Sequence, residues 1–178
     1  MNINDFTFDN PKYAPLRNPA REVIGAYQTA NRFLDTTQEV LYIEYGMKYL
    51  SRLVHNLAHE MPKRFDKFGD MLHERHLMTE YASTPELDWR EELKSVDDCF
   101  AMVIRVLESV QEALEKFHVV TDNAEFRPMA LKTEEFMLQI SEDYTMFLQL
   151  WKRFNVEKGS LTSFDSYCAK FLHDEDDD

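Results

Sequence analysis

The chain has 178 residues, of which 44% are hydrophobic and 30% are charged, a composition typical of one globular domain with an adequate core. Only 4 Gly, 6 Pro and 2 Cys are present, which excludes a collagen-like chain and a disulfide-stabilised scaffold. No run of about 18 apolar residues predicts a membrane span, and the first residues lack the basic and apolar regions of a secretory signal. We therefore expect a cytoplasmic protein with both cysteines reduced.

The charge balance is strongly acidic, because 33 Asp and Glu stand against 20 Lys and Arg and give a formal net charge of -13. Binding to a phosphate backbone depends on clustered Lys and Arg side chains, so direct DNA binding by the folded domain is disfavoured. The same negative field attracts metal cations and basic partners.

Apolar residues recur at alternating steps of three and four through most of the chain, which is the spacing of amphipathic helices. The first stripe continues from Ala26 to Met61, where Pro62 is expected to end the helix, because a residue before proline avoids the α region. Gly46 lies inside this stripe and is interpreted as a tolerated weak point. The sequence Ser83-Thr84-Pro85-Glu86 is typical of a helix N-terminus. These patterns predict helices over residues 26–61, 62–82, from the cap at 83–86 to 117, 130–154 and 161–172, followed by an acidic tail at 174–178.

Four long amphipathic helices with short connections predict an all-α fold, an up-down four-helix bundle with a short extra C-terminal helix. We expect an irregular N-terminal segment at residues 1–18, the bundle at 19–157, and the short helix with its acidic tail at 158–178.

Histidine is the most informative residue type, because four of the six histidines lie close together among carboxylates. Imidazole and carboxylate groups one helical turn apart can converge on a transition metal, and iron, zinc and manganese all accept this donor set. The alternative interpretation is that these residues bind no metal and are ordinary polar side chains on the solvent-exposed surface of an acidic protein. His76 belongs to the cluster, and the candidate ligands are His55, His59, Asp70, His73 and Glu74.

These candidate ligands are expected to face away from the apolar stripes of their helices. A di-iron site inside a bundle requires carboxylates that project inward. Ligands that project outward would instead complete a metal site at an interface between subunits, so the sequence predicts a homo-oligomer.

The segment from His55 to Phe65, followed by Asp70-Met-Leu-His73-Glu74-Arg75, resembles the mini-ferritins of the Dps type, members of the ferritin-like superfamily. The later segment Glu142-Asp143-Tyr144-Thr145-Met146-Phe147 is also similar to that family. The resemblance implies a ferroxidase that oxidises Fe(II) with peroxide or oxygen at two-fold interfaces and stores the ferric mineral in a twelve-subunit shell. It matches His59 to the first-helix ligand and His73 to the second-helix ligand.

The acidic pair of that family has two candidate positions here, Asp70 with Glu74 or Asp88 with Glu92, and the sequence leaves both open. Two other functions also remain open. One is a non-enzymatic acidic helical bundle that binds a basic partner or mimics the charge of DNA. The other is a ferritin-like shell that has lost oxidation.

Overall fold

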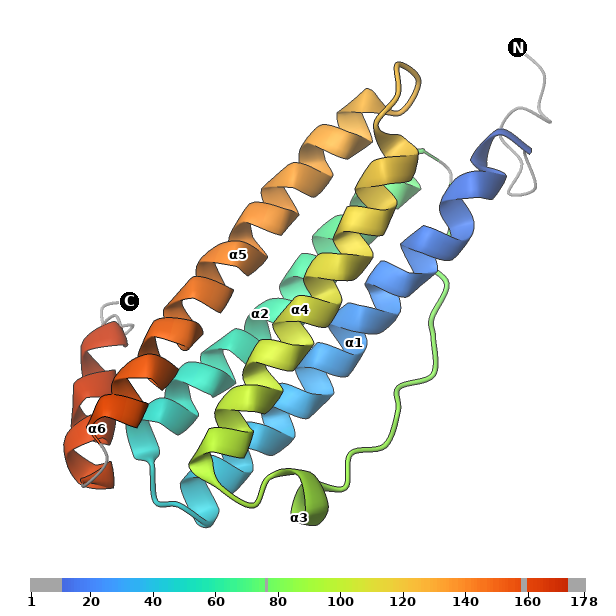
Figure 1. Ribbon diagram of the computed structural model, residues 1–178. Helices are drawn as coiled ribbons and strands as arrows, with labels where there is room; N and C mark the ends of the chain where they lie inside the picture. Colours follow the sequence, from blue (N-terminus) through green and yellow to red (C-terminus); the bar gives the residue numbers. More distant parts are fainter. Residues whose placement is uncertain (1–10, 76, 158–159, 173–178) are drawn as a thin grey trace, which may run out of the picture.

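The computed structural model describes residues 11–75, 77–157 and 160–172, and its described part is a bundle of four long helices (Figure 1). No strand occurs in these ranges, and no described helix is both long enough and apolar enough to span a membrane. The predicted all-α four-helix bundle with a short C-terminal helix is therefore confirmed. The elements are the 3-10 turn η2 (Pro11–Tyr13), the helices α1 (Ala14–Ile43), α2 (Lys48–His73), α3 (Trp89–Glu92), α4 (Val96–Thr121), α5 (Arg127–Val156) and α6 (Leu161–Cys168), and the 3-10 turn η3 (Ala169–Phe171).

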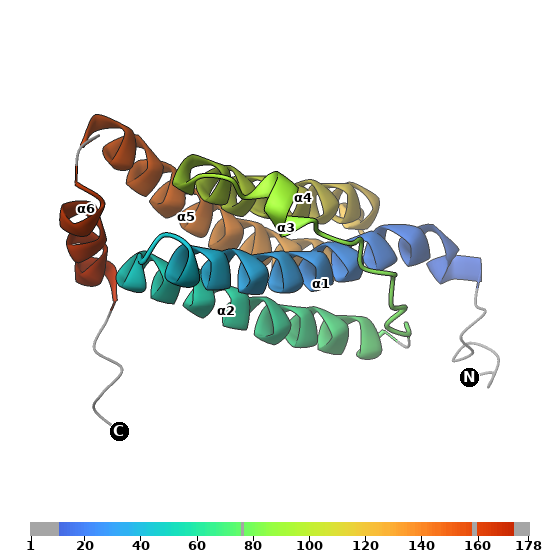
Figure 2. The same cartoon turned by 90° about the horizontal axis from the view of Figure 1, so that it is seen from below.

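The core lies between the four long helices, with α1 packed against α2 and α4, and α4 packed against α5 (Figure 2). Leu34, Leu72 and Leu107 are fully buried there. The ring of Phe68 on α2 makes an edge contact with Phe117 on α4, with centroids 5.0 Å apart. Burial of this apolar surface is the main stabilising contribution to the bundle.

The chain reverses direction at Gly46, where a single helix over residues 26–61 was expected. Helix α1 ends at Ile43, α2 begins at Lys48, and Gly46 has a φ of 65°, the left-handed conformation that glycine adopts at little cost. Met47 beside the turn is buried, with 1% of its surface exposed, whereas Ile43 at the end of α1 is 70% exposed, so the apolar spacing of the sequence hides the reversal. The prediction of one long helix was therefore wrong.

Pro62 lies inside α2 and does not end a helix, so the predicted boundary between residues 61 and 62 was also wrong. Helix α2 ends at His73 instead of continuing to residue 82, and the predicted cap at 83–86 lies in an irregular connection. Helix α4 begins later, at Val96, where the hydroxyl of Ser95 accepts a hydrogen bond from the Asp98 N–H at 3.1 Å.

The connection between α2 and α4 runs along the length of the bundle, so these two helices point in the same direction (Figure 1). The sequence had suggested short connections throughout. The long connection passes close to α1 at Gly25, where an added Cβ would lie 2.9 Å from the Cβ of Ala82. A side chain at position 25 would therefore displace the connection.

The two ends of the bundle agree only in part with the expected limits. Helix α1 begins at Ala14, inside the segment expected to be irregular, while residues 1–10 lie outside the described part. The fourth expected helix is present as α5, and the expected helix at 161–172 is present as α6 and η3. The acidic tail at 174–178 is outside the described residues.

Helix α6 lies across one end of the bundle, and the buried carboxylate of Asp165 fixes it there (Figure 2). Oxygen Oδ1 accepts hydrogen bonds from the backbone N–H groups of Tyr49 and Leu50, both at 2.9 Å. These donors belong to the first turn of α2, whose own N-cap residue, Met47, makes no side-chain capping bond. Asp165 thus caps α2 from a distant part of the chain.

We expect D165A to lower the free energy of unfolding by about 2 kcal/mol, because it removes a charged cap and leaves buried N–H groups unpaired. Urea unfolding followed by circular dichroism measures the loss. The matched control is Ser166→Ala, an exposed neighbour on α6, which should unfold like the parent. Equal stability of D165A and the parent would contradict the capping role.

Candidate metal site

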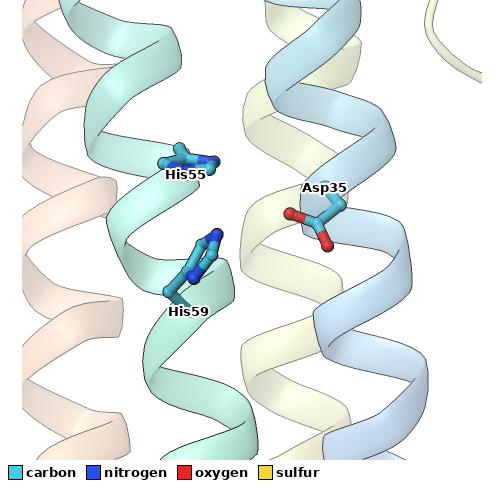
Figure 3. A group of neighbouring side chains, drawn as sticks. All are labelled: Asp35, His55 and His59. Atoms are coloured by element: carbon cyan, nitrogen blue, oxygen red, sulfur yellow. The ribbon is translucent and has the colours of Figure 1, made fainter.

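Three potential metal ligands, Asp35, His55 and His59, converge where α1 and α2 lie side by side (Figure 3), and we call the place where they meet the groove. One ligand atom from each lies within 4.8 Å of the other two. His55 and His59 are one turn apart on α2, with ring centroids 4.2 Å apart, and both rings point toward Asp35 on α1 (Figure 3). Within the described ranges this is the only group of three or more His, Cys, Asp or Glu side chains that meets these distances.

The three side chains of this group differ in exposure. Asp35 and His55 are half-buried, whereas His59 is exposed, so an ion has a path from solvent to the group. The Nδ1 atom of His55 is buried and has no hydrogen-bond partner among the described residues. A buried polar atom without a partner is costly, so this imidazole is available to a ligand.

A hydrogen bond between the helices holds this part of the groove together. Pro62 has no N–H and cannot donate the helical bond that the carbonyl of Ala58 would otherwise accept. The side chain of Asn31 donates to that carbonyl from α1 at 3.0 Å. Asn31 also approaches the carboxylate of Asp35 at 3.5 Å. The proline is thus accommodated in α2 by a bond that ties the two helices together beside the candidate ligands.

The predicted pair His55 and His59 is brought together, but sequence reasoning did not include Asp35. The missing signal was the turn at Gly46. Once α1 and α2 are recognised as antiparallel about that turn, Asp35 lies at nearly the same distance from it as His55. A carboxylate at this position is then expected to face the two histidines.

The other predicted ligands lie near the far end of α2. His59 and His73 are separated by about 21 Å along the helix axis, so one chain cannot bring them to one ion. His73 is within 3.1 Å of the Thr79 hydroxyl, and Glu74 pairs with Lys132 of α5 at 3.5 Å. Asp70, His73 and Glu74 are all exposed, as the sequence suggested, whereas His55 lies partly buried in the groove. His76 is outside the described residues.

The alternative acidic pair, Asp88 and Glu92, is on a different element. Asp88 is the residue before α3, and Glu92 forms an ion pair with Arg105 of α4 at 2.7 Å. Of the two pairs, only Asp70 and Glu74 adjoin the histidines, because Asp70 belongs to α2 and Glu74 is the C-cap residue that follows it. Their service as ligands remains a prediction.

Comparisons with known proteins identify the fold. A scan of protein-family models and a search of curated proteins find no match. Among solved structures, M. penetrans ferritin matches with a TM-score of 0.81 at 11% identity, covering 93% of this chain and 99% of that one. Apo-ferritin from Pseudo-nitzschia multiseries matches with a TM-score of 0.77 at 14% identity, covering 85% of this chain and 97% of that one. The PmFTN variant E44H, soaked in iron, also matches with a TM-score of 0.77 at 14% identity, and the match covers 85% of this chain and 97% of that one.

At these identities the likeness establishes the fold alone, so the chain has the same four-helix bundle fold as these ferritins. The finer resemblance to the Dps type is not addressed by these matches and stays a prediction.

We expect N31A to lower the free energy of unfolding by about 1–2 kcal/mol, because it leaves the buried carbonyl of Ala58 without a donor. In a P62A background the same substitution should cost less than half as much, since the backbone N–H at position 62 then donates to that carbonyl. Urea unfolding of the four chains of this double-mutant cycle measures the difference. Equal costs in both backgrounds would show that Asn31 does not compensate for the proline.

Proposed function

We propose that this protein binds ferrous iron at Asp35, His55 and His59 and oxidises and stores it as a ferritin-like protein. The observation that carries the proposal is the convergence of one carboxylate and two imidazoles within 4.8 Å, with His59 exposed to solvent. Three protein ligands leave further coordination positions for water and for an oxidant, either peroxide or oxygen. The protein would fix the geometry, and the iron would change from Fe(II) to Fe(III).

The donor set alone accepts iron, zinc or manganese. Iron is preferred because matching ferritin crystals were soaked in iron. The net charge of -13 would draw cations toward the protein and oppose contact with DNA. The alternative of an acidic bundle that binds a basic partner is not favoured by matches that are ferritins.

A second copy of the chain would supply the ligands that one chain keeps apart. His55, His59 and Asp70 of α2 and the C-cap residue Glu74, which continues the helical backbone, lie on one side within an arc of about 100°. If two α2 helices pair antiparallel about a two-fold axis between Arg64 and Phe65, His59 of each chain faces Asp70 of the other. The same register places His55 opposite Glu74.

The pair His59 and Asp70 and the pair His55 and Glu74 are both centred between positions 64 and 65. One two-fold contact at that point would therefore bring the histidines of each chain to the carboxylates of the other. His73 lies on the same side of the helix and would be a further ligand. This arrangement would be the homo-oligomeric site of a Dps-type protein, with a twelve-subunit shell in a cytoplasmic setting.

The first test is Fe(II) titration, with oxidation followed by ferric absorbance, on the parent and on H55A/H59A and D35A. We expect both variants to oxidise Fe(II) at least about 10-fold more slowly than the parent, because they lose direct ligands. The matched control is H118A, since His118 is also beside a carboxylate, Glu134 at 2.9 Å, but belongs to α4. A parent rate equal to that of buffer, or an unchanged rate in H55A/H59A, would refute the proposal.

The second test asks whether two chains share the site. H55A/H59A chains and D70A/E74A chains are unfolded together and refolded, then compared with each variant refolded alone. If the site is shared, mixed assemblies contain some sites with all the native ligands, so the mixture should oxidise Fe(II) faster than either variant. A rate equal to the average of the two variants would show that the site belongs to one chain.

A further inference from the structure

A buried ion pair lies inside the bundle, on the opposite side of α2 from the groove. The guanidinium of Arg64 on α2 donates to the carboxylate of Asp143 on α5 at 2.5 Å. The two side chains are 10% and 20% exposed, respectively. Both residues occur near the middle of their helices, so the pair joins α2 and α5 at mid-bundle.

Tyr27 of α1 completes this polar region. Its side chain is 1% exposed, and its hydroxyl is buried with no hydrogen-bond partner among the described residues. Burial raises the pKa of Tyr27, the nearby Arg64 charge opposes the rise, and the Asp143 charge adds to it. The phenol therefore lies within electrostatic reach of both members of the ion pair.

Di-iron proteins with this type of bundle hold their metals in the interior, with one Glu from each of two helices and a Glu-x-x-His motif from each of the other two. The corresponding spacing on α2 here is Met61-x-x-Arg64, and on α5 it is Ile140-x-x-Asp143. The inward positions of α4 include Leu107, Val110 and Leu114, all fully buried and apolar. These residues do not fit an interior di-metal centre, because they provide one carboxylate and a fixed positive charge.

We propose that Arg64 is a built-in cation, and that its guanidinium fills an interior pocket that would otherwise bind a divalent metal ion through oxygen ligands. Carboxylates and a phenol lie around the guanidinium, and one of these carboxylates, Glu60, also pairs with the exposed side chain of Lys63 at 2.7 Å. Burial raises the pKa of Asp143, the charge and hydrogen bond of Arg64 lower it, and the charges of Glu142 and Glu60 add smaller increases. The Tyr27 hydroxyl has an oxygen to offer.

A cation is required here for a physical reason. A carboxylate enclosed in a protein interior is costly unless a positive charge accompanies it. The guanidinium of Arg64 supplies this positive charge permanently, and unlike an iron ion it has no redox chemistry. Iron that enters the protein would then meet no vacant interior centre, and its chemistry would be confined to the groove between α1 and α2.

The test replaces Arg64 in a chain whose groove site has been removed, so it does not depend on the proposed function. In the H55A/H59A background, we expect R64A to lower the Tm. Millimolar Mn²⁺, which prefers oxygen ligands, should then raise it by about 3 °C or more through binding to the folded state. Without R64A, the same background should show no comparable rise.

Two further chains separate this pocket from general cation binding. Arg64→Lys keeps a positive charge and should not respond to Mn²⁺, and R64A/D143N removes the anionic partner and should not respond either. The proposal is overturned if R64A responds no more than its background, or if R64A/D143N responds equally. If R64A does not fold without a metal, the yield of refolded protein with and without Mn²⁺ is measured in place of the Tm. A yield that Mn²⁺ raises in R64A but not in R64A/D143N supports the proposal, and a yield that Mn²⁺ does not raise in R64A overturns it.

Discussion

The hydrogen bond from Asn31 to the carbonyl of Ala58 connects the fold to the candidate metal site. A proline in the middle of α2 leaves that carbonyl without its helical donor, and the side chain from α1 replaces it. His55 and His59 lie on either side of Ala58 in the sequence, and Asp35 follows Asn31 by one helical turn. The bond that allows Pro62 in α2 therefore also fixes the separation of the helices at the point where the three ligands meet.

Sequence periodicity identifies the presence of long amphipathic helices, but it does not show where the chain reverses. The apolar spacing of the sequence runs unbroken through Val40, Ile43 and Met47, but in the structure Ile43 is 70% exposed while Val40 and Met47 are buried, so the turn leaves no gap in the sequence pattern. Gly46 was the only local indication of the reversal, and Pro62 suggested a boundary that Asn31 makes unnecessary. The later helices were easier to locate, because α5 and α6 are separated by polar residues and a cap at Ser160.

Because the sequence pattern does not show where the chain reverses, it could identify only the candidate ligands that share one helix. His55 and His59 could be paired from their spacing alone, since both belong to α2. Asp35 belongs to α1 and becomes their neighbour only through the turn, so no spacing rule links it to them. The interior ion pair is less accessible still, because Arg64 and Asp143 are brought together by packing between helices that are distant in the sequence.

Helix α2 separates the positive charge of Arg64 from the candidate metal site. Arg64 lies about 180° around the helix from His55, so its guanidinium enters the bundle while the imidazole faces the groove. Inside, the charge belongs to the chain, and its carboxylate partner cannot exchange it. On the other side, the three candidate ligands are two imidazoles and a carboxylate, so at the proposed site the positive charge would be an ion from solvent. The antiparallel register proposed for two copies is centred beside Arg64, which places the permanent charge and the exchangeable site on opposite sides of the same segment of α2.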